Sequence, residues 1–281
     1  MSTISEIADA VELRTWANDQ PYSIGALKED LEAILPGDGS KKPEDYAREV
    51  FEEMIDRGRL LGAAYPYDLD GVTLTPNTLK LNSSYLFCLG LNFFENIPLR
   101  IRSPEFEALV RSAAEKYFSG EAIRIGAPWK TGTITEYKTL LKMVSNLIPD
   151  LGPPTREKAP DGGDAGWDVV VVNNFADHKF PRIIALGNCA TGKTDWRKKG
   201  MEAQDTFFWS FFTKEPQNTN TCLTFIAVPF LMTDEEKLRK TARTCITFDR
   251  IRICEQAPST STYSMRWLEG HRADALDIPL M

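Results

Sequence analysis

The chain has 281 residues, 42% of them hydrophobic, and a formal net charge of −7, enough for one large or two ordinary domains with a buried core. Only two histidines are present, His178 and His271, which argues against histidine-rich metal sites and against a Ser-His-Asp triad. No apolar run reaches the length of a membrane span, and the polar, acidic N-terminus resembles neither a signal peptide nor a transit peptide. We therefore expect a cytoplasmic protein without a membrane partner.

The negative charge is concentrated in the first part of the chain. Residues 1–60 hold 7 Lys and Arg against 14 Asp and Glu, whereas the remainder is balanced. Because an acidic surface repels DNA, this part is expected to dock a protein partner or to regulate the rest. The five cysteines form no CxxC pair, which predicts reduced core thiols and neither a disulfide framework nor a zinc knuckle.

Residues 1–100 are predicted to form a mainly helical accessory domain. Helices are expected over residues 3–18 and 24–35, and from Pro43 to about residue 59, where apolar side chains recur at helical spacing. A hairpin that turns at Asp70-Gly71 follows, and then an apolar run, 83–94, that is typical of a buried helix. Helices followed by a hairpin suggest a winged-helix-like or accessory domain.

Residues 101–281 are predicted to form a second, α/β domain. Its first helix is expected to begin at Pro104, with Ser103 as its cap. A second amphipathic helix is expected over 135–149, and the aromatic segment 207–212 suits a core or a partner interface. The apolar segments that predict strands are 122–125, 167–173, 182–186, 222–231 and 244–254.

The segment from Gly187 to Thr194 fits the phosphate-loop pattern G-x-x-x-x-G-K-[ST] at every specified position. A predicted strand precedes it, as such a loop requires. The residues that follow, beginning at Asp195, are mostly polar, whereas a helix that packs under a sheet should become apolar at once. Too few residues remain after this segment for the usual parallel sheet, so we rank nucleotide binding below the two interpretations that follow, a nuclease and a DNA-binding subunit.

A metal-dependent nuclease is the first interpretation of the same region. Hydrolysis of a phosphodiester needs an activated water and stabilisation of extra negative charge, which Mg²⁺ held by carboxylates supplies. Asp168 opens one predicted strand and Asn188 lies just beyond the next, followed by Lys193 and Lys198. Glu107 lies on the early helix, which can pack across the same sheet.

These residues resemble the PD-(D/E)XK superfamily of restriction-endonuclease-like nucleases over about residues 103–255, most closely its bacterial phage-defence branches. The early helix of that family carries a Phe-Glu pair, matched by Phe106-Glu107. Its Gly/Asp-rich turn and second strand are matched by Gly163-Asp164-Ala-Gly-Trp-Asp168, by Gly187-Asn188-Cys189-Ala190, and by Trp196 and Lys198 that follow.

The resemblance implies a restriction-endonuclease-like core, a central mixed sheet flanked by helices. It also implies cleavage of DNA that depends on Mg²⁺, with Mn²⁺ as a substitute, in an anti-phage defence system with an ATPase or helicase partner. It does not fix the oligomeric state, and a homo-oligomer is one alternative. The metal ligands would be Asp168, Asn188, Asp164 and Glu107. Asn188 stands where the family usually has Glu, Asp or Gln. Ala190 stands where the family has a Lys, and the role of that Lys would pass to Lys198 or else to Lys193.

Each of these residues also has a purely structural interpretation. Asp164 and Asp168 suit a glycine-rich turn, Asn188 suits an ordinary turn, and Glu107 would face solvent by default on an amphipathic helix. Lys198 lies in a run of basic residues that is typical of a solvated face or of a track for the DNA backbone. The chief alternative is therefore a catalytically weak or dead DNA-binding or scaffold subunit on the same fold.

Overall fold

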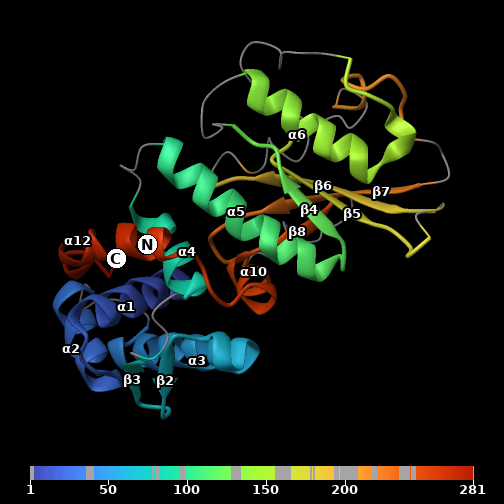
Figure 1. Cartoon of the computed structure of the whole chain (residues 1–281). Helices are drawn as coiled ribbons and strands as arrows, with labels where there is room; N and C mark the ends of the chain where they lie inside the picture. The colour runs from blue at the N-terminus through green and yellow to red at the C-terminus, as the bar shows by residue number, and fades with distance from the viewer. Residues whose placement is uncertain are drawn as a thin grey trace. The chain divides into compact units, whose positions relative to one another are not determined.

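The chain divides into two compact units in the computed structural model (Figure 1). Unit 1 comprises residues 1–94 and 258–281, and unit 2 comprises residues 95–257. For 99–102 and 134–136 only the backbone is described. The described residues are 3–35, 41–77, 79, 83–94, 99–127, 134–155, 166–177, 179, 181–192, 196, 208–216, 220–233, 241 and 245–280.

Unit 1 is built mainly of helices with a small antiparallel sheet. Its helices are α1 (Ile4–Asn18), α2 (Ile24–Ile34), α3 (Pro43–Leu61), α4 (Ser84–Phe93), α11 (Thr262–Glu269) and α12 (Arg272–Leu276). The strands β1 (Tyr22–Ser23), β2 (Tyr67–Leu69) and β3 (Thr73–Pro76) pair in the order β1-β3-β2. The order of elements from α1 to β3 is helix, strand, two helices and a hairpin.

Helix caps explain where the helices of unit 1 begin. Thr3 forms a capping box with Glu6, and Ser23 and Ser83 accept hydrogen bonds from the first turns of α2 and α4. Helix α4 is almost wholly buried, as its apolar sequence predicted.

The C-terminal helices α11 and α12 belong to unit 1, although the sequence analysis assigned residues 258–281 to the second domain. Helix α11 packs on α4 and helix α12 packs on α1. Leu268 is fully buried, and a Cβ atom at Gly90 would stand 2.4 Å from Leu268, so α4 and α11 approach closely. This pairing of segments far apart in the chain leaves no local signal in the sequence.

Unit 2 is an α/β structure around a mixed sheet. Its strands are β4 (Glu121–Arg124), β5 (Val169–Asn173), β6 (Ile183–Cys189), β7 (Thr221–Ala227) and β8 (Ile246–Phe248), in that order across the sheet. Its described helices include α5 (Leu99–Tyr117), α6 (Ile134–Leu147) and α10 (Arg250–Gln256). β4, β5 and β6 run antiparallel, whereas β6, β7 and β8 run parallel, which confirms the expected α/β class with a mixed sheet flanked by helices.

Helices cover both faces of this sheet (Figure 1). Leu141 and Val144 of α6 pack with Val170 and with the aromatic residues around Phe208, which confirms the aromatic segment as core. On the opposite face, Phe118 at the end of α5 contacts the rings of Phe225 and Phe248, and α10 packs on α5. Because both faces of β5 and β6 are covered, the sequences of these strands are apolar without alternation.

Three predicted boundaries are wrong. Helix α5 begins five residues before Pro104, which lies inside it. The strand expected over 244–254 is short, because Asp249 caps helix α10 through the N–H of Arg252. Strand β6 continues to Cys189, so Asn188 lies within the strand and not beyond it.

No helix in the described part of the chain is both long and apolar enough to cross a membrane.

Candidate functional site

Two buried carboxylates converge beside Gly126, just after β4. A Cβ atom at Gly126 would stand 2.5 Å from Oε2 of Glu107 and 2.7 Å from Oδ1 of Asp168. Both oxygens therefore lie close against Gly126, and any side chain at this position would collide with them. We call Glu107, Arg124, Gly126 and Asp168 the carboxylate site.

The sheet places this site at one edge, where its strands begin or end. Arg124 ends β4, Asp168 precedes β5 and Cys189 ends β6. The residues in register with Val169 across the sheet are Arg124, Gly187, Phe225 and Ile246. The parallel strands β7 and β8 thus end at the same edge, so groups from helix α5 and from several strands meet there.

Asp168 is fixed by hydrogen bonds from three directions. Its N–H donates to the carbonyl of Gly187 (2.9 Å), and its carbonyl accepts the N–H groups of Ile125 (2.8 Å) and Gly126 (3.1 Å). Its Oδ2 accepts the N–H of Cys189 at 2.6 Å. One carboxylate oxygen is therefore anchored to β6, while Oδ1 is the oxygen that faces Gly126 and Glu107.

Glu107 is buried on α5 and forms an ion pair with Arg124. The Nε atom of Arg124 lies 2.7 Å from Oε2 of Glu107. The Glu107 side chain is 3% exposed and that of Arg124 is 19% exposed, so the guanidinium links a buried acid to the surface. The structural interpretation of Glu107 as a solvent-facing residue is thereby ruled out.

Asn188 lies level with Asp168 on the neighbouring strand. Val169 of β5 pairs with Gly187 of β6, and the strands are antiparallel, so the next position places Asp168 opposite Asn188. Asn188 is 3% exposed. Ile184, Leu186 and Asn188 are each two residues apart in β6, so their side chains share one face of the sheet. The structure thus places Asp168, Asn188 and Glu107 around one sheet edge.

The other predicted site residues lie outside the described residues. They are Asp164, Lys193 and Lys198. Ala190, which stands where the resemblance expects a Lys, is buried in an apolar cluster with Trp196 and Val228. Among the described residues, no group of three or more His, Cys, Asp or Glu is placed to hold a metal ion.

The donor set of the carboxylate site nevertheless suits a hard divalent cation. Mg²⁺ is usually held by one or two carboxylates and keeps several of its waters. Two buried carboxylates that lie against the same glycine, with Asn188 level with one of them, supply oxygen donors of that kind. Glycine at position 126 keeps the space between them free of a side chain.

The phosphate-loop interpretation is not supported by this geometry. Gly187, Asn188 and Cys189 lie inside β6, which is paired on both sides, and the Cys189 N–H is used by Asp168. A phosphate loop needs such N–H groups directed at the ligand. Gly187 has a packing reason instead, because a Cβ atom there would stand 2.0 Å from the ring of Phe225.

Sequence reasoning missed Arg124 and Gly126. Arg124 ends the short strand β4 and Gly126 follows it, and the 38 residues from Ile125 to Gly162 separate this strand from the motif that ends at Asp168. An Arg at the end of an apolar strand with a Gly two residues later was the only available signal. Pairing of β4 with β5 brings these residues to Asp168.

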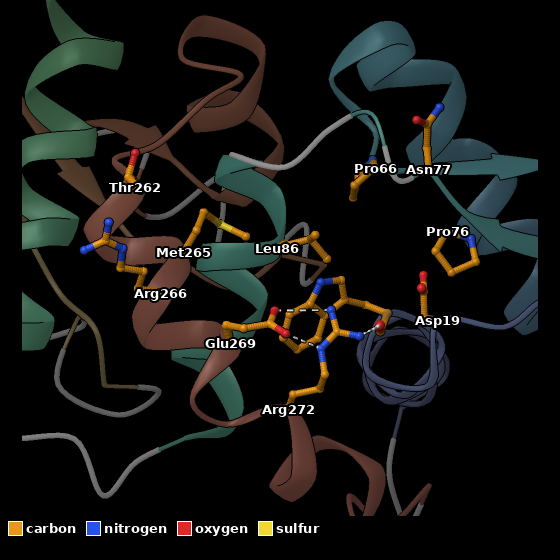
Figure 2. Close-up of a pocket in the computed structure, with 11 residues that line it drawn as sticks. Asp19, Pro66, Pro76, Asn77, Leu86, Thr262, Met265, Arg266, Glu269 and Arg272 are labelled. Carbon is orange, nitrogen blue, oxygen red and sulfur yellow. Dashed lines mark hydrogen bonds and ion pairs between the residues drawn. The ribbon is translucent and has the colours of Figure 1, made fainter.

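Unit 1 contains a pocket of about 340 Å³ that includes apolar side chains such as Pro66, Pro76 and Leu86 (Figure 2). On its wall, Arg272 donates to Glu269 (2.6 Å) and to carbonyl groups at the end of α1, and its guanidinium stacks over the Trp16 ring. These charged groups satisfy one another, so we assign the pocket no catalytic role.

Comparison of this chain with protein-family models, with curated proteins and with solved structures found no match.

Proposed function

We propose that unit 2 is a Mg²⁺-dependent nuclease domain with a restriction-endonuclease-like core, which hydrolyses phosphodiester bonds of DNA. The observation that carries the proposal is the convergence of Glu107 and Asp168 on Gly126 at the sheet edge. The resemblance required a helix acid and a strand acid to meet, although 61 positions separate them in the sequence.

The order of elements also supports the proposal. Helix α5 precedes three antiparallel strands, β4, β5 and β6, and β7 then lies parallel to β6. The candidate ligands come from the first helix, from the start of the second strand and from the end of the third. This is the one-helix-and-hairpin framework from which the sequence analysis derived its site.

The residues of the chain have separate roles in this proposal. Asp168, Glu107 and Asn188 would hold the metal ion, which when bound would lower the pKa of a water and neutralise charge on the phosphate. The Cys189 N–H fixes Asp168, so its second oxygen keeps one direction. The ion pair with Arg124 orients Glu107 in the same way. Fixed donors of this kind reduce the reorganisation that a reaction requires.

The acidic charge of the N-terminal part supports a role in protein docking. Helix α3 carries six acidic residues and three arginines, which suits a protein contact better than a DNA contact. We propose that unit 1 binds the ATPase or helicase partner of a bacterial defence system and that unit 2 acts on DNA.

The second candidate is a DNA-binding subunit without catalysis on the same fold. Ala190 favours it, because this buried position provides no cation beside Asn188. The two candidates differ in whether DNA is cut at all.

A cleavage assay separates the candidates. The full chain is incubated with supercoiled plasmid, linear duplex or RNA in Mg²⁺ or Mn²⁺, and Asp168→Asn is the test variant. Asn retains an acceptor for the Cys189 N–H but lacks the charge, so we expect a loss of at least about a hundredfold in cleavage.

Asp177→Asn is the matched control, because Asp177 lies exposed in a turn of unit 2. It should cleave as the unaltered chain does. Duplex binding without cleavage in either metal would support the binding subunit, and equal cleavage by Asp168→Asn would remove Asp168 from the mechanism.

A further inference from the structure

The pocket of unit 1 has a largely apolar lining. Its volume is about 340 Å³, at the small end of the range for ligand sites, and its apolar walls include Trp16, Pro66, Pro76, Leu86 and Met265. In Figure 2, Met265 lies on one side of the pocket and Pro76 on the other, with Leu86 between them. A ligand with an apolar body would therefore be enclosed from several sides.

Asp19 brings a carboxylate to the same lining. It ends helix α1 with φ 54° and ψ 32°, in the left-handed region, and its N–H donates to the carbonyl groups of Thr15 and Trp16. Asp19 is exposed, and its side chain forms no hydrogen bond or ion pair with the other residues that the structure describes. Its carboxylate is therefore available to a ligand.

The position of Asp19 in the fold does not favour an acid. Helices that end in the left-handed conformation most often have Gly there, and sometimes Asn. A negative charge at a C-terminus is also repelled by the partial charges of the last carbonyl groups. Asn would keep the conformation and remove this repulsion. An acid that meets local penalties and has no described partner in the fold is a candidate for binding.

The other charged side chains of the pocket leave the negative charge of Asp19 in place. Arg272 donates to both carboxylate oxygens of Glu269, at 2.6 Å and 3.2 Å, so these two charges offset each other. Figure 2 shows the side chain of Arg266 directed away from Asp19. The pocket therefore offers apolar walls with an acid at one side.

We propose that this pocket binds a segment of the partner protein in which a Lys or Arg adjoins a large apolar side chain. The apolar side chain would occupy the pocket, and the cation would pair with Asp19. Lys and Arg suit such a place, because their apolar stems lie along apolar walls while the charged end stays in water. This inference rests on the proposed docking role of unit 1, whose acidic excess over residues 1–60 favours a basic partner.

The methyl group of Met265 provides a signal at the pocket. The full chain is labelled with ¹³C at its methionine methyl groups, and Met265→Leu assigns the signal of Met265. The probes are the peptides acetyl-Gly-Trp-Lys-Gly-amide and acetyl-Gly-Trp-Glu-Gly-amide, which differ in the sign of one charge. We expect the Lys peptide to shift the Met265 signal with a Kd about fivefold lower than that of the Glu peptide, because Asp19 attracts one and repels the other.

Asp19→Asn separates binding from folding. Without the charge, the Kd values of the two peptides should come within about twofold of each other. Removal of the repulsion at the end of α1 should at the same time raise the thermal midpoint of unit 1 by about 1–4 °C. A residue that only supported the fold would lower this midpoint. Asp19→Gly, which suits the left-handed conformation, should also lose the preference for the Lys peptide.

Glu29→Gln is the matched control. Glu29 is an exposed acid of α2 that does not line the pocket, so its variant changes the charge of unit 1 as much as Asp19→Asn does. The fivefold preference for the Lys peptide should remain. A Met265 signal that neither peptide shifts, or a preference that persists in Asp19→Asn, would overturn the proposal.

Tryptamine tests whether the occupant is a peptide. It carries the same ring and an ammonium group but has no peptide backbone, so we expect it to bind at least about threefold more weakly than the Lys peptide. Equal or tighter binding would assign the pocket to a small amine and overturn the proposed occupant.

The peptide titration and the cleavage assay fail independently. If the chain cuts no nucleic acid but the preference for the Lys peptide depends on Asp19, the hydrolysis proposal falls and the pocket proposal stands. If the chain cuts DNA but neither peptide shifts the Met265 signal, the pocket proposal falls and the nuclease stands.

Discussion

Each unit buries two carboxylates beside one arginine, but the two clusters differ in the exposure of the arginine and in the elements that carry them. In unit 1, Asp9, Glu12 and Arg57 are each at most 3% exposed, and we call them, with Tyr65 and Tyr85, the Arg57 cluster. In unit 2, the carboxylate site has a partly exposed arginine, and its two acids lie close against Gly126.

The Arg57 cluster uses nearly all of its hydrogen-bonding groups. Arg57 donates to Glu12 (2.9 Å) and pairs with Asp9 (2.9 Å), while Glu12 also accepts from Tyr65 (2.6 Å) and Tyr85 (2.7 Å). Burial alone would lower the pKa of Arg57, but Glu12 and the neighbouring groups raise that pKa well above its ordinary value. A network with its partners in place stabilises a fold and leaves no position for a ligand.

The carboxylate site differs in the direction of its oxygens. Oδ1 of Asp168 and Oε2 of Glu107 lie within 2.7 Å of the position that a Cβ atom at Gly126 would occupy. Similar residues therefore lie in different settings: helices enclose the ion pairs of the Arg57 cluster, whereas the sheet edge carries the acids that we propose as ligands of a cation. The following substitutions test this distinction, from the largest expected effect to the smallest.

Arg57→Met should destabilise unit 1 by about 3–5 kcal/mol, because it leaves two buried carboxylates without their cation. Urea unfolding and hydrogen exchange of α1 and α3 would measure the loss. Arg59→Met is the control, since 74% of the Arg59 side chain is exposed, and it should change stability by less than about 0.5 kcal/mol. Equal effects of both variants would mean that the Arg57 cluster contributes little.

Gly126→Ala should destabilise unit 2 by about 1–3 kcal/mol and abolish metal-dependent cleavage, because its Cβ would stand within 2.7 Å of both carboxylates. Thermal unfolding and the plasmid assay would measure the two effects. Gly25→Ala is the control, because a Cβ there meets only Ser23 Oγ at 3.7 Å. A fully active Gly126→Ala would show that the two acids do not work at this point.

Alkaline pH should weaken unit 1 through Tyr65. Burial raises the pKa of Tyr65 well above 10, and the Glu12 carboxylate raises it further. The folded state therefore keeps a proton that the unfolded state releases, so the contribution is complete below the unfolded pKa and falls above about pH 10, by up to about 1.4 kcal/mol per pH unit.

Urea unfolding between pH 8 and pH 11 would measure this slope. Tyr65→Phe removes the titrating group and should show a flatter dependence, together with a loss of about 1–3 kcal/mol at neutral pH from the donor that Glu12 no longer has. An unchanged slope would assign the alkaline loss to other groups.

The same Glu→Gln substitution should act oppositely in the two clusters. Glu107→Gln should change stability by less than about 1 kcal/mol, because it relieves repulsion from Asp168 while Arg124 reaches solvent. It should still abolish metal-dependent cleavage. Glu12→Gln should cost about 1–3 kcal/mol and leave cleavage intact. Urea unfolding and the plasmid assay on both variants would detect a reversal of this pattern.

Much of the fold could be predicted from local pattern. Helices α1 to α4 agree with their predicted ranges to within a few residues, because capping residues and apolar spacing are local. The hairpin at Asp70-Gly71 was predicted from its turn residues, and Asp70 accepts hydrogen bonds from Val72 and Thr73. The errors lie where one segment carries signals for two kinds of element. Residues 244–254 were predicted as one strand, but Asp249 caps helix α10 and the strand ends before it.

The candidate site was only half predictable. Asp168, Asn188 and Glu107 were chosen from their residue types and from the resemblance, and the structure brings them to one edge. Neither Arg124 nor Gly126 was chosen, because their role depends on how β4 pairs with β5 across a long insertion that contains α6. The Arg57 cluster was missed for the same reason, since the sequence did not show which face of α1 would be buried.

The sequence by itself determined the α/β class, the elements with strong periodicity, the acidic N-terminal part and the residue types that suit phosphodiester chemistry. The tertiary structure alone decided that residues 258–281 complete unit 1, that Glu107 is buried, and that Arg124 pairs with it. Local spacing fixes hydrogen bonds and faces within an element, whereas contacts across dozens of residues depend on which faces pack. The ion pair between Arg124 and Glu107 is a contact of that second kind.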